Sequence, residues 1–228
     1  MTSLELKPYM GLPRIVERLR DKLGFTDNHK RIGRIYRALG LQMGRRKRRD
    51  RRAHRPRLAM AAPTRPNELW AMDFVLDSFA SGRRFRTLNV KDLFTHEAVV
   101  IEVSRSITGN DVARVLDEVG RQRGYPAAIV CDNGTEFTSI AMDKWSYRTK
   151  TDLKFIQPGK PIQNAFIESF NAIFRNECLN RYWFNDINEA RRIIETWRQE
   201  YNRERTQKRL GKKTPEQFAR NYAEMLSA

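Results

Sequence analysis

Three strand-like segments in a row constrain the fold of this chain more than any other feature. Residues 69–77, 84–92 and 97–103 carry apolar side chains in the alternating or clustered patterns of buried strands, and short polar turns separate them. Turns of this length join neighbouring antiparallel strands. The sequence therefore predicts an antiparallel meander of three strands at the start of the core.

Helices and single strands alternate after this meander. Residues 109–122 have the apolar spacing of a helix, residues 127–131 form a short apolar strand, and residues 140–149 are a second helix. Trp145 in that helix is expected to be half buried. A last strand follows at residues 153–157, and then another helix. This order predicts an α/β fold with a mixed sheet, three antiparallel strands and then two more, with flanking helices.

Three carboxylates are carried by separate elements of this pattern. Asp73 lies within the first strand, Asp132 directly after the short apolar strand, and Glu168 in the helix that follows the last strand. Asp132 and Glu168 are separated by 35 intervening residues. Each carboxylate also has a purely structural interpretation: a strand-end residue, part of a tight turn in DNGTEF, and one residue of a solvated helix face. The three together are more specific than any one.

The helix that carries Glu168 has two different faces. Its apolar residues are expected to face the core: Phe166, Ile167, Phe170, Ile173 and Phe174. Its polar residues line the opposite side at helical spacing: Asn164, Glu168, Asn171 and Arg175. Carboxylate oxygens are the ligands that Mg²⁺ prefers. Two such ions roughly 3.5–4 Å apart activate the attacking oxygen and stabilise the leaving oxygen in a phosphoryl displacement, which is the chemistry that these residues indicate.

The chain is strongly basic, with a net charge of +17 over 228 residues. Such a charge predicts a polyanionic partner, nucleic acid first and a membrane surface second. Residues 44–57 contain nine Lys or Arg and one Asp, a local charge of +8. This run is expected to lie along phosphates, and a solubilising linker is the alternative. Its candidate DNA-binding residues are Arg45, Arg46, Lys47, Arg48, Arg49, Arg51 and Arg52.

Helical segments flank the core. Residues 11–24 and a second helix capped by Asn28 and stopped by Gly40 predict a small helix-turn-helix-like unit, with a hairpin that merely packs on the core as the alternative. The second helix is expected to use one apolar side: Ile32, Ile35, Tyr36 and Leu39. A later stripe predicts a helix packed on its own core rather than a dimer seam: Ile187, Ala190, Ile194, Trp197 and Tyr201. Pro215 opens a closing helix.

Several protein classes do not fit the composition. No apolar run approaches the roughly 18–20 residues that span a bilayer, and no signal-peptide apolar region occurs near the N-terminus. Two cysteines, Cys131 and Cys178, fit a reducing cytoplasm better than a disulfide framework. With three histidines, structural zinc is not expected, and the lack of a glycine-rich phosphate loop predicts no nucleotide cofactor.

Four motifs carry a resemblance to a known family: RPNELWAMDF, CDNGTEF, GKPIQNAFIESFNAIFRNECLN and YNRER…LGKKTPEQFA. Through them, over roughly residues 28–222, the chain resembles the second reading-frame transposases of the bacterial insertion sequence three family. The spacing of Asp132 and Glu168 is that of the DDE transposases and retroviral integrases. The resemblance implies an RNase H-like core in which Asp73, Asp132 and Glu168 are catalytic and bind Mg²⁺, with Mn²⁺ able to substitute and two ions in the site.

The same resemblance implies contacts to DNA near this site. Arg175 matches a basic position of the family that touches DNA, and Lys160 and Asn164 are further candidate contacts. Three departures from the family pattern put the positioning of DNA in question: Cys131 replaces the usual Ser, Leu76 a polar residue, and ERTQKRL the more typical ERPHSAL. None of the three carboxylates is lost.

The function expected from these observations is cleavage and strand transfer of DNA by an insertion-sequence transposase. The predicted domains are a helical unit at 1–43, a basic linker at 44–66, an integrase catalytic core at 67–182 and a helical extension at 183–228. Two alternatives stay open: a non-catalytic DNA-binding repressor or decoy derived from a transposase, and an RNase H-like nuclease. The expected partners are DNA, the upstream reading-frame product and further copies of the chain on DNA, and no membrane.

The segment before Gly11 is too short for the upstream end-recognition module that the resemblance implies. This polypeptide alone is therefore expected to bind DNA tightly but with poor specificity.

Overall fold

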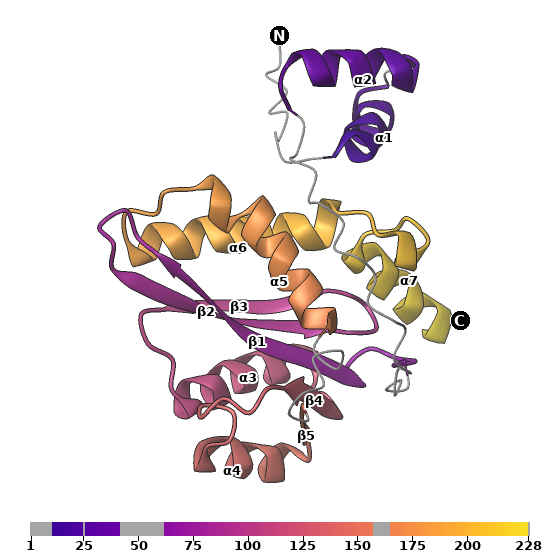
Figure 1. Ribbon diagram of the computed structural model, residues 1–228. Helices are drawn as coiled ribbons and strands as arrows, with labels where there is room; N and C mark the ends of the chain where they lie inside the picture. Colours follow the sequence, from indigo (N-terminus) through magenta and orange to yellow (C-terminus); the bar gives the residue numbers. More distant parts are fainter. Residues whose placement is uncertain (1–10, 25, 42–61, 157–164, 228) are drawn as a thin grey trace, which may run out of the picture. The chain divides into compact units, whose positions relative to one another are not determined.

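The chain divides into two units, Met1–Pro56 and Arg57–Ala228. A computed structural model describes residues 11–24, 26–41, 62–156 and 165–227 (Figure 1). None of the helices in these residues is long and apolar enough to cross a membrane. The boundaries proposed from the sequence for four separate domains stay predictions.

The N-terminal unit contains a pair of helices, α1 (Leu12–Leu23) and α2 (His29–Ala38). Asn28 caps α2 as predicted, because its side-chain oxygen accepts a hydrogen bond from the backbone N–H of Lys30 at 3.0 Å. The two helices pack through a small cluster of buried side chains: Ile15, Ile32 and Tyr36.

Two apolar residues of α2 lie outside this cluster. Ile35 is 52% exposed and Leu39 is 58% exposed. Ile35 and Leu39 lie one helical turn apart, on a side of α2 next to the side that carries Ile32 and Tyr36. Helix α1 covers the side of Ile32 and Tyr36 only. The predicted apolar side of α2 is therefore only partly covered within the described residues.

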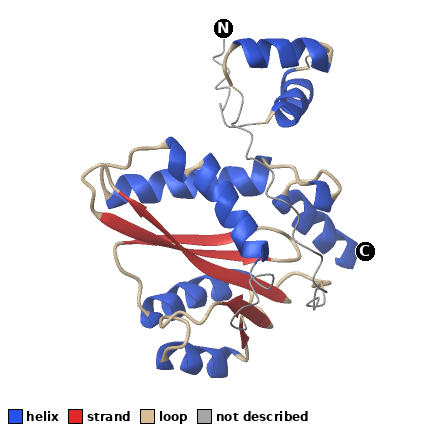
Figure 2. Ribbon diagram, viewed as in Figure 1, coloured by secondary structure: helices blue, strands red, loops and turns tan. Residues whose placement is uncertain are grey.

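The C-terminal unit is built on a five-stranded mixed sheet (Figure 2). The predicted meander is confirmed: β1 (Leu69–Ser78), β2 (Arg84–Asp92) and β3 (Ala98–Ser104) are each antiparallel to the next. The two later strands are parallel to β1 and complete the order β3-β2-β1-β4-β5: β4 (Ala128–Cys131) and β5 (Asp152–Phe155).

Helices cover both faces of this sheet (Figure 1). One face carries α3 (Gly109–Arg123) and α4 (Ile140–Thr149), and the other carries α5 (Ala165–Glu177) and α6 (Ile187–Glu204). Two short 3₁₀ helices and a closing helix complete the described chain: η2 (Leu179–Arg181), η3 (Lys208–Leu210) and α7 (Pro215–Ser227).

The α3/α4 face is packed with apolar side chains. Its cluster includes Trp70 and Met72 of β1 and Leu88 and Val90 of β2. Trp145 of α4 belongs to it with an exposure of 2%, so the prediction that it is half buried is wrong. Its indole Nε1 donates a hydrogen bond to Asp117 of α3 at 2.9 Å, which allows the ring to be buried completely.

The α5/α6 face combines apolar and polar side chains. The α6 stripe lies in this cluster as predicted, with four residues buried: Ala190, Ile194, Trp197 and Tyr201. Phe166 differs from expectation, because it is 44% exposed while Ile167, Phe170 and Phe174 are buried. It lies in the first turn of α5, where fewer neighbours cover a side chain.

Strand β2 shows the contrast between the two faces most clearly. Leu88 and Val90 point to the α3/α4 cluster. The residues that alternate with them on the opposite side of the strand are polar or charged, although they are buried: Thr87, Asn89 and Lys91. Polar groups therefore face α5, the helix that carries Glu168.

Candidate active site

Asp73 lies in the middle of β1 and faces α5. One of its carboxylate oxygens accepts a hydrogen bond from the Asn171 side-chain amide at 2.8 Å, and the other accepts one from the Phe74 backbone N–H at 2.8 Å. Burial, and to a smaller extent the negative charges of Asp132 and Glu168, outweigh these hydrogen bonds and raise the pKa of Asp73 to about 6. The three carboxylates that the sequence singled out thus share one electrostatic neighbourhood.

Asp132 directly follows β4 and begins the turn that precedes α4. The β1–β4 pairing places Ala71 beside Val130, so Asp73 and Asp132 are each two residues beyond the same pair of neighbours. Asp132 is exposed, and its side chain accepts a hydrogen bond from the Gly134 backbone N–H at 2.9 Å. Glu168 lies in the first turn of α5 and is exposed too. Solvent therefore reaches both carboxylates.

A chain of hydrogen bonds runs from β2 through α5 to Asp73. Thr87 donates to Asn89 at 2.9 Å, Asn89 donates to Asn171 at 2.7 Å, and Asn171 donates to the carboxylate of Asp73. Thr87 and Asn89 are completely buried. Because each amide has its oxygen and nitrogen fixed by a neighbour, the chain holds the Asp73 carboxylate in one orientation. Thr87 and Asn89 are not among the site residues predicted from the sequence, although two polar residues on one side of a buried strand are a usable signal.

The three carboxylates do not form a closed ligand set as they stand. Among the residues that the structure describes, no group of three or more His, Cys, Asp or Glu side chains is arranged so that it could hold a metal ion. Like charges repel, so carboxylates without a cation between them are expected to spread apart. Their chemistry nevertheless fits a divalent cation, because all three present oxygen ligands from adjacent elements and two of them are open to solvent.

An arginine of β2 contacts the turn that follows Asp132. Glu136 forms an ion pair with Arg86, whose guanidinium lies 3.7 Å from the centroid of the Phe74 ring. Phe74 in turn stacks on Phe137 of the same turn, with 4.8 Å between ring centroids. This arrangement ties the turn that carries Asp132 to the strand that carries Asp73.

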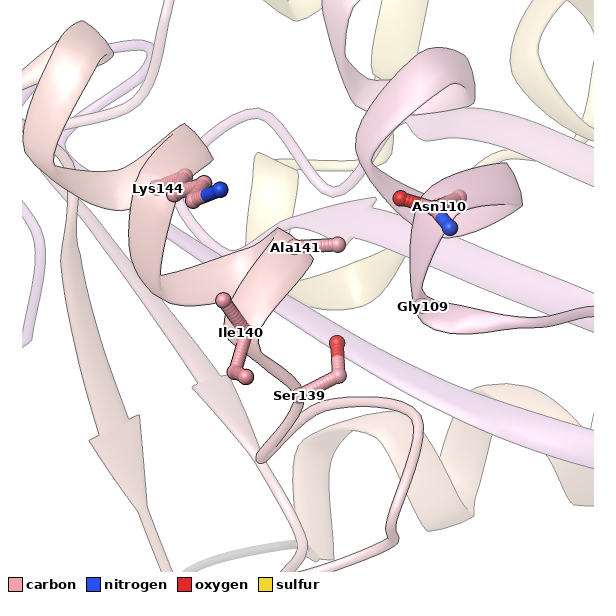
Figure 3. A pocket seen from close by; sticks show the side chains of 6 residues that line it. All are labelled: Gly109, Asn110, Ser139, Ile140, Ala141 and Lys144. Carbon is pink, nitrogen blue, oxygen red and sulfur yellow. The ribbon is translucent and has the colours of Figure 1, made fainter.

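A hollow of about 350 Å³ lies elsewhere on this unit, between the first residues of α3 and α4 (Figure 3). Its lining is Gly109, Asn110, Ser139, Ile140, Ala141 and Lys144. None of the three carboxylates lines it. The first residues of the two helices are in close contact here. A Cβ on Gly109 would lie only 2.0 Å from the Ser139 hydroxyl oxygen, so the position has no room for a side chain.

The predicted DNA contacts fall mostly outside the described residues. These are Arg45, Arg46, Lys47, Arg48, Arg49, Arg51, Arg52, Lys160 and Asn164. Arg175 is described, and its guanidinium donates a hydrogen bond to the backbone carbonyl of Leu76 at 2.8 Å. The roles of all these residues stay predictions.

Comparison with known proteins connects this geometry to a family. Two models of an integrase core domain match the chain, one over residues 63–161 and one over residues 149–215. An uncharacterized 31.7 kDa protein of insertion element IS407 from Burkholderia multivorans is 48% identical over 214 residues, which are 94% of this chain and 76% of that protein. The chain belongs to the insertion sequence three family of transposases. The resemblance inferred from the four motifs is thereby confirmed.

Other members of the family are more distant or longer. An uncharacterized 39.2 kDa protein of insertion element IS476 from Xanthomonas euvesicatoria is 45% identical over 86% of this chain, and the chain spans 56% of its length. The putative transposase InsK for insertion sequence element IS150 from Escherichia coli is 26% identical over 84% of this chain and 71% of its own length.

Solved structures confirm the predicted integrase-like, RNase H-like fold. The catalytic core domain of HTLV-2 integrase, solved in complex with magnesium, is similar with a TM-score of 0.56 at 18% identity, over 68% of this chain and 97% of that one. A simian T-cell lymphotropic virus intasome, solved with a PP2A regulatory subunit, has a TM-score of 0.65 at 15% identity, over 92% of this chain and 71% of that one.

One departure from the family pattern now has a structural explanation. Cys131, where the family usually has Ser, is the completely buried last residue of β4. Burial, followed by the charge of Asp132, raises the pKa of its thiol to about 12. Cys131 is therefore a small packed residue and is inert as a nucleophile at neutral pH.

Proposed function

We propose that this chain is the catalytic subunit of DNA transposition and that it cleaves and transfers DNA strands in a metal-dependent reaction. The observation that carries the proposal is the common neighbourhood of Asp73, Asp132 and Glu168, on two adjacent strands and a helix, in a member of the insertion sequence three family. Asp73 and Asp132 would hold one Mg²⁺ or Mn²⁺ ion, and Asp73 and Glu168 a second. When bound, such ions activate the attacking oxygen and stabilise the leaving oxygen of a phosphodiester.

The protein's own contribution is positioning. Asp73, which would contribute to both ion positions, is held in one orientation by Asn171, and Asn89 in turn orients Asn171. Asp132 and Glu168 are exposed and can rotate toward an ion and a DNA strand. No residue of the chain becomes covalently attached to DNA in this scheme. The attacking groups are a water molecule at the cleavage step and a 3′-hydroxyl of DNA at the transfer step.

The chain is proposed to act on the ends of its insertion element, in the bacterial cytoplasm and nucleoid, as several copies assembled on DNA. The net charge of +17 supports a polyanionic partner. The upstream reading-frame product, fused or separate, is proposed to recognise the element ends. Without it, we expect tight binding with poor sequence specificity and little correctly placed cleavage.

The experiment is a cleavage and joining assay with terminal-repeat DNA, Mg²⁺ and the chain fused to its upstream module. We expect Glu168→Gln to lower both cleavage and joining by roughly a thousandfold, the scale seen when a transition-state-stabilising group is removed. Glu224→Gln, at an exposed position of α7, is the matched control and should be fully active. Cleavage without joining would favour a nuclease. Binding without either reaction would favour a repressor or decoy.

A further inference from the structure

A buried lysine without a partner lies on the same sheet face as the carboxylates. Lys91 is the penultimate residue of β2 and only 5% of it is exposed. Its ammonium nitrogen lies 5.6 Å from the centroid of the Phe170 ring of α5. Among the described residues, Lys91 makes no side-chain hydrogen bond and no ion pair. A buried cation without a partner is costly, so its retention calls for an explanation.

The neighbouring acid in the sequence does not supply a partner. Asp92 is completely buried, and its carboxylate accepts hydrogen bonds from the backbone N–H groups of Asn67, Phe94 and Thr95 at 2.8–3.0 Å. It also forms an ion pair with Arg123 at 3.4 Å. The lone pairs of Asp92 are therefore already occupied.

Further positive charge surrounds Lys91 where the chain leaves α6. Arg209 of η3 has its guanidinium 5.8 Å from the Phe166 ring centroid, and it makes no ion pair among the described residues. Arg205 lies nearby but is paired with Glu177. Burial, then the charges of Arg209 and Arg205, lower the pKa of Lys91 to about 8, with Asp92 acting in the opposite direction. Burial together with Lys91 and Arg209 also keeps His96 neutral, since its pKa falls to about 3.

The tip of Lys91 is not fully enclosed, although only 5% of the residue is exposed. In the described part of the chain, the only fully enclosed side-chain nitrogen or oxygen without a partner is Nε of Arg86. The unpartnered ammonium of Lys91 therefore retains some contact with solvent. Arg209 is exposed. The two cations thus have no anionic partner among the described residues, and Arg209 is open to solvent.

Lys91 also lies near the carboxylate of Asp73 on the sheet. Lys91 is two residues from Asn89 on the same side of β2, a separation of about 7 Å along a strand. In the register of β1 and β2, Asn89 is paired with Asp73, and Lys91 is paired with Ala71, two residues from Asp73 on the same side of β1. An anion at Lys91 would therefore lie on the same face of the sheet as the Asp73 carboxylate and only a few residues from it.

We propose that Lys91 and Arg209 form a binding site for one backbone phosphate of the DNA strand that the carboxylate site engages. This inference rests on the proposed function for the identity of the ligand. A phosphodiester fits because it carries one negative charge with several acceptor oxygens, and because guanidinium and ammonium groups are the usual donors to it. The phosphate would supply the charge and the hydrogen bonds that Lys91 lacks within the protein.

The test measures binding to a branched DNA, whose junction fixes where the protein sits, with single phosphates replaced by neutral methylphosphonates. We expect a methylphosphonate at one position near the junction to weaken binding of the wild-type chain by roughly tenfold, the scale of a hydrogen bond to a charged group. Lys91→Met and Arg209→Gln should each bind the unmodified DNA comparably more weakly and lower the salt slope by about one. Both variants should be insensitive to that methylphosphonate. Lys154→Met and Arg84→Gln, at exposed positions of β5 and β2, are the matched controls.

Stability gives a second readout that does not depend on DNA. Lys91→Met removes an unpaired buried charge, so the melting temperature without DNA should rise. A fall in melting temperature, or unchanged methylphosphonate sensitivity in both variants, would overturn the proposal. Binding is measured in the Asp132→Asn background as well. If the methylphosphonate has no effect on binding although the wild-type chain joins DNA, only this phosphate site is refuted. If the methylphosphonate weakens binding as expected but the wild-type chain joins no DNA, only the proposed function is refuted.

Discussion

The two faces of the central sheet are made from the same strands, and both pack apolar clusters, but they differ in the side chains that β2 contributes. In β2, Leu88 and Val90 contribute to the apolar cluster under α3 and α4. On the other side of the strand, the buried residues Asn89 and Lys91 face α5. One face is an ordinary apolar core. The other combines an apolar cluster with a hydrogen-bonded chain and a buried cation that has no ionic partner among the described residues.

The difference separates stability from chemistry within one element. Apolar burial stabilises the fold on the α3/α4 side. On the α5/α6 side, Asn89 orients Asp73 through Asn171, and Lys91 has no compensating group among the described residues. Sequences are expected to break the rules of local consistency at functional sites. The comparison predicts that substitutions on the two faces will affect different measurements.

The largest expected effect on stability is on the α3/α4 face. Leu88 is completely buried, so Leu88→Ala should lower the free energy of unfolding by about 2–5 kcal/mol through lost burial and a residual cavity. Leu76→Ala, at a residue of β1 that is 60% exposed, should change it by less than about 0.5 kcal/mol. Urea unfolding measures both. Strand joining per folded molecule of Leu88→Ala should be unchanged, and a large loss there would break the separation of the two faces.

The next effect is on the α5/α6 face. Asn171→Leu removes the amide that holds Asp73, so joining should fall by roughly tenfold to a hundredfold. It also leaves Asn89 without its acceptor, which should lower the free energy of unfolding by about 1–3 kcal/mol.

A triple variant separates these two consequences. In this variant, apolar groups replace all three side chains that donate the hydrogen bonds between β2, α5 and Asp73: Thr87→Val, Asn89→Leu and Asn171→Leu. The free energy of unfolding should recover, because no buried polar group is left unpaired, whereas joining should not recover. Recovery of joining in the triple variant would show that the hydrogen-bonded chain serves packing alone.

A further effect on the α5/α6 face is the pH dependence of stability that Lys91 confers. Folding lowers its pKa from the ordinary value of 10.5 to about 8, because burial and the charges of Arg209 and Arg205 disfavour the ammonium. Below about pH 8, where Lys91 is protonated in both the folded and the unfolded chain, its buried charge lowers the free energy of unfolding by the full amount. This destabilisation is relieved between about 8 and 10.5, where the unfolded chain binds the proton and the folded protein has released it. The free energy of unfolding of the wild-type chain relative to Lys91→Met should therefore rise over this interval, and a flat difference would contradict the assignment.

The contrast between the faces also explains what the sequence could predict. Periodicity located β2 at residues 84–92 and α4 at residues 140–149, because regular spacing of apolar side chains is a local property. It misjudged Trp145 and Phe166, because burial depends on which element packs against a side chain. Motif and spacing singled out the three carboxylates, whose catalytic role stays a prediction. Asn89 was missed, because its meaning depends on a partner that lies 82 positions away in the chain.

The most direct test of the catalytic assignment is the reversal of strand transfer on a branched DNA that mimics the joined product. A site that catalyses joining must also catalyse its reverse, and a preassembled branch removes the need to recognise an element end. With Mg²⁺ or Mn²⁺, the 228-residue chain should reseal the branch, and so should Asp143→Asn, an exposed control in α4. Asp132→Asn should bind the branch with unchanged affinity and reseal none of it. Resealing by Asp132→Asn at the wild-type rate would contradict the assignment of catalysis to the three carboxylates.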